Sequence, residues 1–176
     1  MSRIETRRTD GRVAITGAAM IVLLVACNGS PTTRDTNDST APALTMSIAG
    51  TKQNPGGIDD NIAAGSTTEL RPQGAQVLIK ASDSGGVSFV ELWLTEKETC
   101  PGVNAGPTLA GKAAARTNGT VTATQAPSSL TAAYRIDPAG RKVGCLYTFE
   151  VWGQADNAAT TPVHAKSQVA RVTLQT

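Results

Sequence analysis

Apolar and polar residues alternate in short runs along most of the chain after residue 43. Alternation with a period of two is typical of strands that bury one face and leave the other in water. Glycine, proline, asparagine and aspartate separate the runs, as turn formers do, and helix-forming sequence is almost missing. We therefore predict strands at residues 44–48, 76–81, 88–95, 120–125, 130–136, 147–154 and 168–174. Seven short strands within residues 44–176 favour a single all-β sandwich domain.

Two segments of this domain resemble strands of bacterial immunoglobulin-like domains. Residues 77–94, VLIKASDSGGVSFVELWL, resemble the second and third strands, and residues 147–161, YTFEVWGQADNAATT, resemble the penultimate strand and its turn. The resemblance implies an immunoglobulin-like antiparallel sandwich, a fold that hosts many unrelated functions. The chain departs from the family in its long insertion at residues 96–116. It also lacks the second-strand cysteine of antibody domains.

The first 26 residues have the pattern of a secretory signal peptide. Arginines at positions 3, 7, 8 and 12 precede an uncharged stretch from Val13 to Ala26. As a helix, this stretch would be only about 21 Å long, which is too short for the ~30 Å hydrocarbon core of a bilayer. The pattern predicts export, and we expect an extracytoplasmic location.

The signal peptide ends in Leu24-Val25-Ala26-Cys27, which resembles the lipobox of bacterial lipoproteins. The resemblance implies a diacylglycerol on the Cys27 sulfur and cleavage before that residue, so the membrane would be a partner through this anchor. Two acyl chains suffice for stable anchoring. The alternative is an ordinary cleavage site with a cysteine beside it. Either the cell membrane or an outer membrane could hold the anchor.

Residues 27–43 are predicted to be the lipidated N-terminus and a flexible linker. The segment is rich in Thr, Asp, Asn, Ser and Pro and has too little apolar surface to offset the entropy of ordering. A flexible chain of about 16 residues would hold the domain some 20–25 Å from the membrane. Without the signal peptide, 12 basic and 12 acidic residues remain, so the charge gives no sign of a nucleic-acid partner.

Two cysteines remain once Cys27 is lipidated, and exported proteins retain disulfides. Cys100 and Cys145 are then the possible intramolecular pair. Closing a loop of about 45 residues contributes on the order of 4 kcal/mol in the loop-entropy model. The chain has no CxxC or Cys/His cluster, so we expect no structural metal and no cofactor.

The alternation assigns side chains to the two faces of each strand. In residues 88–95 Glu91 shares a face with Trp93, and in residues 147–154 Glu150 shares a face with Trp152. An unpaired buried carboxylate is costly, so both glutamates should mark the solvent side. Both tryptophans, and Phe89 with them, are then expected to point outward.

The cysteines suggest a register for these two strands. The immunoglobulin-like topology implied by the resemblance makes them antiparallel neighbours, and if Cys100 faces Cys145, Trp93 faces Trp152. Trp93, Trp152 and Phe89 are therefore the candidate binding residues. They could form an exposed aromatic platform for a sugar, a peptide or a protein, or residues 96–116 could fold over the sheet and cover the rings.

Other polar residues give weaker candidates. Asp83 and Asp156 are expected on loops at one end of the sandwich, and Asp59 and Asp60 at the other. Carboxylates on loops can bind Ca²⁺, but aspartate is also a common turn former, and the chain has no EF-hand spacing. His164, the single histidine, is expected in a surface turn.

We expect a binding or structural module of the cell envelope rather than an enzyme. No Gly-x-Ser-x-Gly elbow is present, and an open sheet face would neither raise the pKa of a glutamate such as Glu91 or Glu150 nor exclude water. Two alternatives remain open: a carbohydrate-binding protein that uses the tryptophan pair, and an enzyme with its site in residues 96–116.

Overall fold

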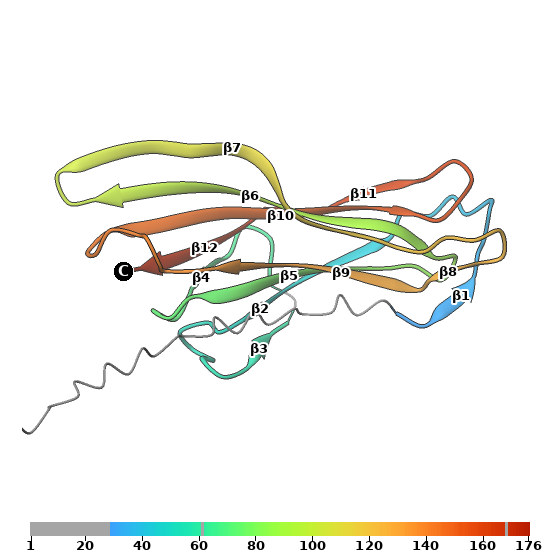
Figure 1. Ribbon diagram of the computed structural model, residues 1–176, viewed down its shortest axis with the longest axis horizontal. Coiled ribbons are helices and arrows are strands. Elements are labelled where there is room, and N and C mark those ends of the chain that lie inside the picture. Colours follow the sequence, from blue (N-terminus) through green and yellow to red (C-terminus); the bar gives the residue numbers. More distant parts are fainter. Residues whose placement is uncertain (1–28, 61, 168) are drawn as a thin grey trace, which may run out of the picture.

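A computed structural model describes residues 29–60, 62–167 and 169–176, and for residues 103–114 the backbone alone. The predicted signal peptide and Cys27 lie outside the described residues. The described chain is all-β and contains no helix, hence none that could cross a membrane. These residues form a β-sandwich (Figure 1).

Two sheets make up the sandwich. The larger has the order β4 (Thr67–Glu69), β12 (Ala170–Gln175), β10 (Leu146–Asn157), β6 (Val87–Cys100), β7 (Val103–Asn118), with β11 (His164–Lys166) also paired to β10. The smaller has the order β3 (Ile58–Asp59), β2 (Ala43–Ala49), β5 (Ala75–Ser82), β9 (Ser129–Ile136). The pair β4–β12 is parallel and the other pairs are antiparallel. The division of β2, β5 and β9 from β6, β10 and β12 is the immunoglobulin-like arrangement.

The core lies between the sheets and follows the predicted alternation. Every second residue of β5 and of β10 is buried. The largest fully buried side chains include Phe149, Ile79, Leu92, Leu130 and Leu174. Gly153 stands at a core-facing position of β10, where an added Cβ would come 2.4 Å from Ile79 Cγ2. The sheets therefore pack too closely here for a larger residue.

Six of the seven predicted strands occur at the expected places, as β2, β5, β6, β9, β10 and β12. The strand predicted at residues 120–125 is wrong. Its middle is a tight turn in which Thr122 Oγ1 accepts a hydrogen bond from the Gln125 amide at 2.9 Å, and only β8 (Gln125–Pro127) follows. Threonine is common in strands, but its hydroxyl can also accept a backbone hydrogen bond in a turn, as Thr122 does here.

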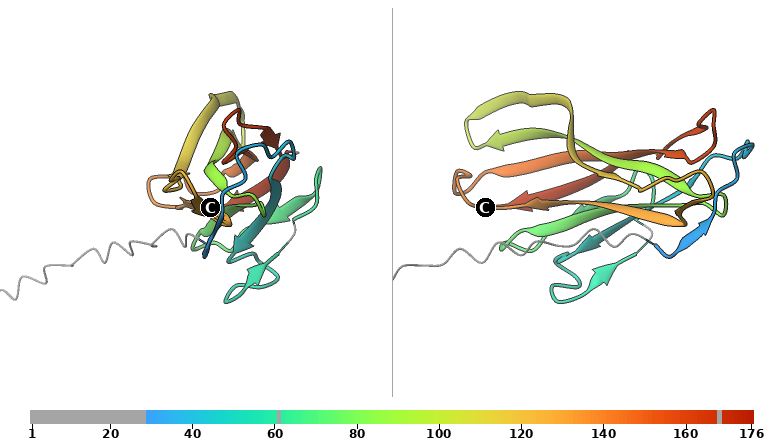
Figure 2. Two further views of the ribbon diagram at one scale, coloured as in Figure 1. Left: turned by 90° about the vertical axis from the view of Figure 1, so that its right-hand side faces the viewer. Right: turned by 45° about the vertical axis from the view of Figure 1, so that its right-hand side comes forward.

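The insertion at residues 96–116 continues the larger sheet as a hairpin. Strand β6 runs on to Cys100, the chain turns at Pro101 and Gly102, and β7 returns beside it as the edge strand (Figure 2). Gly102 has a φ of 77°, a conformation that glycine adopts without strain. The backbone of this segment therefore lies in the plane of the sheet and does not fold across its outer face.

The N-terminal part of the domain differs from the expected flexible linker. Residues 29–42, here called the docked segment, begin with strand β1 (Pro31–Thr33), which pairs with β8. Beyond β1, Arg34 Nε donates to the Ala158 carbonyl at 2.6 Å. The segment buries little apolar surface, but its polar groups find hydrogen-bond partners in the loops at this end of the sandwich. Composition alone could not reveal those partners.

Candidate functional site

The outer face of the larger sheet carries the predicted tryptophan pair. Trp93 of β6 lies directly opposite Trp152 of β10 in the ladder. The two ring centroids are 6.2 Å apart and the ring planes are within 10° of parallel. Both side chains are half-buried. The register predicted from the two cysteines is confirmed, since a disulfide joins Cys100 and Cys145 at the end of the same ladder.

Glu91 anchors a polar network beside the pair. Its Oε1 accepts from Arg116 Nη1 at 2.5 Å, and its Oε2 accepts from Gln154 Nε2 at 2.6 Å and from Trp93 Nε1 at 3.3 Å. The indole N–H of Trp93 is thereby tied to a carboxylate on its own strand. These contacts restrain the orientation of the ring.

Two cations flank the aromatic residues. The Arg116 guanidinium lies 4.2 Å from the centroid of the Phe89 ring, and Lys166 Nζ lies 5.8 Å from the centroid of the Trp152 ring. Both distances are within the range of cation–π attraction. Together, six side chains form one feature, here called the aromatic–polar stripe: Phe89, Glu91, Trp93, Arg116, Trp152 and Gln154.

The environment of Glu91 keeps it ionised. Burial by itself would raise the pKa of this carboxyl, but the hydrogen bond from Gln154, the charge and hydrogen bond of Arg116 and the Trp93 indole outweigh it. The pKa of Glu91 is therefore below its ordinary value. A carboxylate held in this state is a poor general acid, and its oxygens are already engaged by donors. The arrangement suits recognition better than proton transfer.

The predicted faces are confirmed, while one predicted exposure is wrong. Glu91 points to the outer face, where all its partners lie, but it is only 6% exposed. The prediction failed because Arg116 and Gln154 cover and neutralise the charge. Glu150 is on the outer face as well, with a half-exposed side chain paired to Arg171 at 3.1 Å.

Sequence analysis missed Arg116 and Gln154. Gln154 could have been found, because the register that pairs Trp93 with Trp152 also pairs Glu91 with Gln154. Arg116 faces Glu91 across the β6–β7 ladder. That ladder contains four register shifts, so counting residues from the hairpin turn would not have placed Arg116 there.

Of the remaining candidates, Asp156 lies beside the stripe, opposite Phe89 in the β6–β10 ladder, whereas Asp59 and Asp83 lie elsewhere. Asp156 bonds His164, with Oδ1 and Nδ1 2.6 Å apart, and Asp59 accepts from Thr51 and Asn54. Asp83 accepts from the Gly85 amide in the turn before β6, as a turn-forming aspartate does. These aspartates thus make hydrogen bonds within turns and at strand ends.

One group of side chains has the spacing of metal ligands within the described part of the chain. It consists of Glu98, Cys100 and Cys145. Both sulfur atoms are used in the disulfide, and Glu98 is bonded to Lys142 and Tyr147. These atoms are therefore committed to protein contacts.

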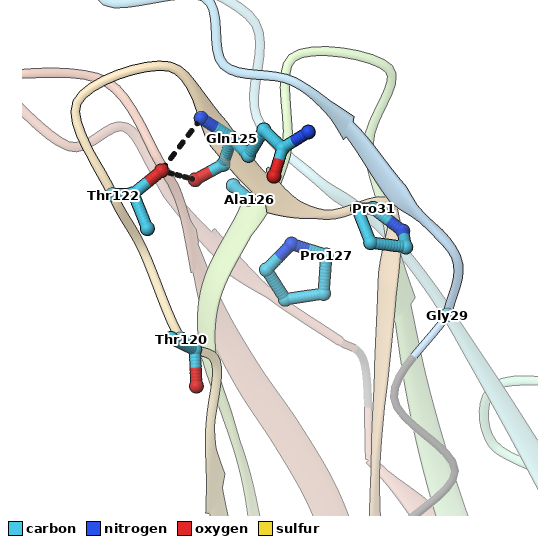
Figure 3. A pocket seen from close by; sticks show the side chains of 7 residues that line it. All are labelled: Gly29, Pro31, Thr120, Thr122, Gln125, Ala126 and Pro127. Carbon is cyan, nitrogen blue, oxygen red and sulfur yellow. Dashed lines mark hydrogen bonds between the residues drawn. The ribbon is translucent and has the colours of Figure 1, made fainter.

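A pocket of about 210 Å³ lies at the end of the sandwich where β1 meets β8 (Figure 3). Its lining residues are all uncharged: Gly29, Pro31, Thr120, Thr122, Gln125, Ala126 and Pro127. The pocket offers hydroxyl and amide groups but no titratable side chain, so it lacks the means for acid–base chemistry.

Comparisons with protein-family models, curated proteins and solved structures gave no match to this chain.

Proposed function

We propose that the mature chain is an extracytoplasmic, membrane-anchored binding module that is not an enzyme. Cys27 would carry the lipid anchor, and the aromatic–polar stripe would contact the ligand. The lipobox-like residues 24–27 support the anchor, and the Cys100–Cys145 disulfide fits a compartment in which disulfides persist. The stripe is the observation that carries the binding role.

The stripe has the properties of a preorganised contact surface. Trp93 and Trp152 are half-buried, so they expose part of a large apolar ring while neighbours restrain them. A ring fixed in the free protein loses less entropy on binding than a mobile one. Tryptophan also dominates the energy of many interfaces. The restraint of the two indole rings by their neighbours is thus an advantage for binding.

The ligand class that the stripe favours is a glycan. Apolar ring surface and hydrogen-bonding groups occur side by side, with Gln154 and Arg116 next to the indoles. Sugars present both C–H surfaces and hydroxyl groups, and binding sites commonly combine apolar area with a few fixed polar groups. A protein partner is the second candidate, because Trp and Arg are also the residues enriched at protein interfaces.

The alternative of an enzyme with its site in residues 96–116 gains no support from the backbone. This segment is a continuous hairpin of the larger sheet. We therefore keep the non-catalytic proposal.

A glycan array with the full mature protein in detergent tests the proposal. We expect binding that is lost in Trp93→Ala and in Trp152→Ala. Leu146→Ala is the matched control, since Leu146 is an exposed apolar residue on the same face of β10. Chemical crosslinking in intact cells tests the protein alternative with the same three variants. If neither glycan binding nor any crosslink depends on the tryptophans, the stripe is not a binding surface.

A further inference from the structure

Because the docked segment is bound to the sandwich, the domain lies closer to the predicted anchor than a flexible linker would place it. Its first described residue, Gly29, donates its amide to the Ser129 carbonyl at 2.7 Å. Strand β1 follows at once and pairs with β8. The chain is therefore attached to the sandwich from residue 29 onward, instead of leaving it at residue 43.

Further contacts fix the segment after β1. Arg34 spans two loops, because Nε donates to the Ala158 carbonyl and Nη1 to the Thr122 carbonyl at 3.1 Å. The Asn157 side chain donates to the Asp38 and Thr40 carbonyls. The partners lie in the loop after β7, at the end of β10 and in the loop that follows β10, so the segment is held from Gly29 to Thr40.

Covalent geometry then limits how far Cys27 can lie from the domain. Only two peptide units separate it from Gly29, and an extended chain spans at most about 3.6 Å per residue, so the two Cα atoms are within about 7 Å. A flexible linker of the whole predicted length would have given some 20–25 Å.

The segments that flank this attachment point carry no charged side chain of their own, and the charged residues of the docked segment, Arg34, Asp35 and Asp38, come only after β1. Residues 117–134, which contain β8 and the turns beside it, include no Asp, Glu, Lys or Arg, and neither do residues 28–33. Thr120, Ala123 and Thr124 are exposed there. Bringing these flanking segments against lipid headgroups desolvates no charge that they carry themselves, and desolvation of charge is the costly part of burial.

We propose that the β1–β8 end of the sandwich rests on the bilayer surface. The proposal depends on the lipid anchor at Cys27 suggested above. The long axis of the domain then points away from the membrane, because the turn between β6 and β7 and the loop at residues 137–144 lie at the opposite end from β1 and β8 (Figure 1). The aromatic–polar stripe faces sideways, between these two ends.

Cysteine labelling of the lipidated protein tests this orientation. Ala123→Cys and Ala139→Cys are a matched pair, because both alanines are exposed and they lie in loops at opposite ends of the sandwich. The protein is reconstituted in phosphatidylcholine vesicles, which are neutral and do not repel the nearby carboxylates of Asp35 and Asp38. The rate of modification by a polyethylene glycol maleimide is then compared in vesicles and in detergent.

We expect vesicles to slow the labelling of Ala123→Cys several-fold and to leave that of Ala139→Cys unchanged. A flexible Gly-Ser insert of about 20 residues before Gly29, with a reach of some 25 Å, should restore the labelling of Ala123→Cys. Equal rates for the two cysteines in floated vesicles would overturn the orientation alone, as would protection that survives the insert. Protein that does not float with the vesicles would overturn the anchor itself.

Discussion

Trp93 and Trp152 stand directly opposite each other on β6 and β10, with ring planes within 10° of parallel and centroids 6.2 Å apart. Aromatic pairs in this distance range contribute about 0.5–1.5 kcal/mol beyond the area that they bury. The pair should therefore be energetically coupled in the unliganded protein as well as available to a ligand.

Coupling is measured by a double-mutant cycle. Trp93→Ala and Trp152→Ala should each lower the free energy of unfolding in urea, and the double variant should lose about 0.5–1.5 kcal/mol less than the sum of the single losses. The same cycle with Trp93 and Leu146, six residues from Trp152 on β10, serves as the control and should be additive. Additivity in both cycles would show that the rings do not interact.

The two outward glutamates should differ sharply in their contribution to stability. Glu91 is buried and accepts three side-chain hydrogen bonds, whereas Glu150 is half-exposed and pairs with Arg171. At pH 7, Glu91→Gln should lower the free energy of unfolding by about 1.5–3 kcal/mol, the range for hydrogen bonds to a charged group. Glu150→Gln should cost less than about 1 kcal/mol, as exposed ion pairs do.

The pH dependence of the Glu91→Gln effect follows from the lowered pKa of Glu91. The folded state binds a proton less readily than the unfolded state, so the contribution of Glu91 is complete above the unfolded pKa of about 4.3. It is lost as the pH falls through the lower folded pKa. The difference in unfolding free energy between wild type and Glu91→Gln should therefore shrink below pH 4 or so. An equal difference at pH 7 and pH 3 would contradict the assignment.

These residues also show which features the sequence could predict. The faces of β6 and β10 and the Trp93–Trp152 register followed from alternation and from two cysteines, since a period of two is a local property. The burial of Glu91 depends on Arg116, which reaches it across a ladder with several bulges. Long-range pairing of that kind leaves no periodic trace in the sequence.

The prediction of a flexible linker at the docked segment was wrong for a related reason. Its composition predicts that the segment buries little apolar surface, and this part of the prediction is correct. Order comes instead from backbone pairing with β8 and from side chains such as Arg34 and Asn157, more than 80 residues apart from their partners in several cases. Composition cannot identify partners at that distance.

The Cys100–Cys145 disulfide should stabilise the domain strongly. It joins residues 45 apart in sequence, which corresponds to about 4 kcal/mol in the loop-entropy model. A Cys100→Ser/Cys145→Ser variant should lose a free energy of unfolding of this order, and treatment of the wild type with dithiothreitol should give a similar loss. Dithiothreitol should leave the unfolding free energy of the serine variant unchanged. If it lowers that value, the loss seen in the wild type does not come from the disulfide.

Asn157 should control whether the docked segment stays on the sandwich. Its side chain is fully buried, with Nδ2 donating to the Thr40 carbonyl at 2.8 Å and to the Asp38 carbonyl at 3.1 Å, and Oδ1 accepting from the Val163 amide at 2.9 Å. Asn157→Asp keeps the acceptor but replaces the donor by a carboxylate oxygen that faces two carbonyl oxygens. Repulsion should release the segment at neutral pH.

Release is measured by trypsin cleavage after Arg34 and by amide hydrogen exchange in residues 35–42. Both should be faster in Asn157→Asp than in wild type at pH 7. Hydrogen exchange, corrected for its own pH dependence, should slow again near pH 4, because a protonated aspartate regains a donor. Asn118→Asp, the same substitution at an exposed asparagine, is the matched control and should leave the rates of cleavage and of hydrogen exchange unchanged. If Asn157→Asp is cleaved and exchanged at wild-type rates, then β1 and Arg34 hold the segment without Asn157, and the orientation proposed for the membrane would depend on them alone.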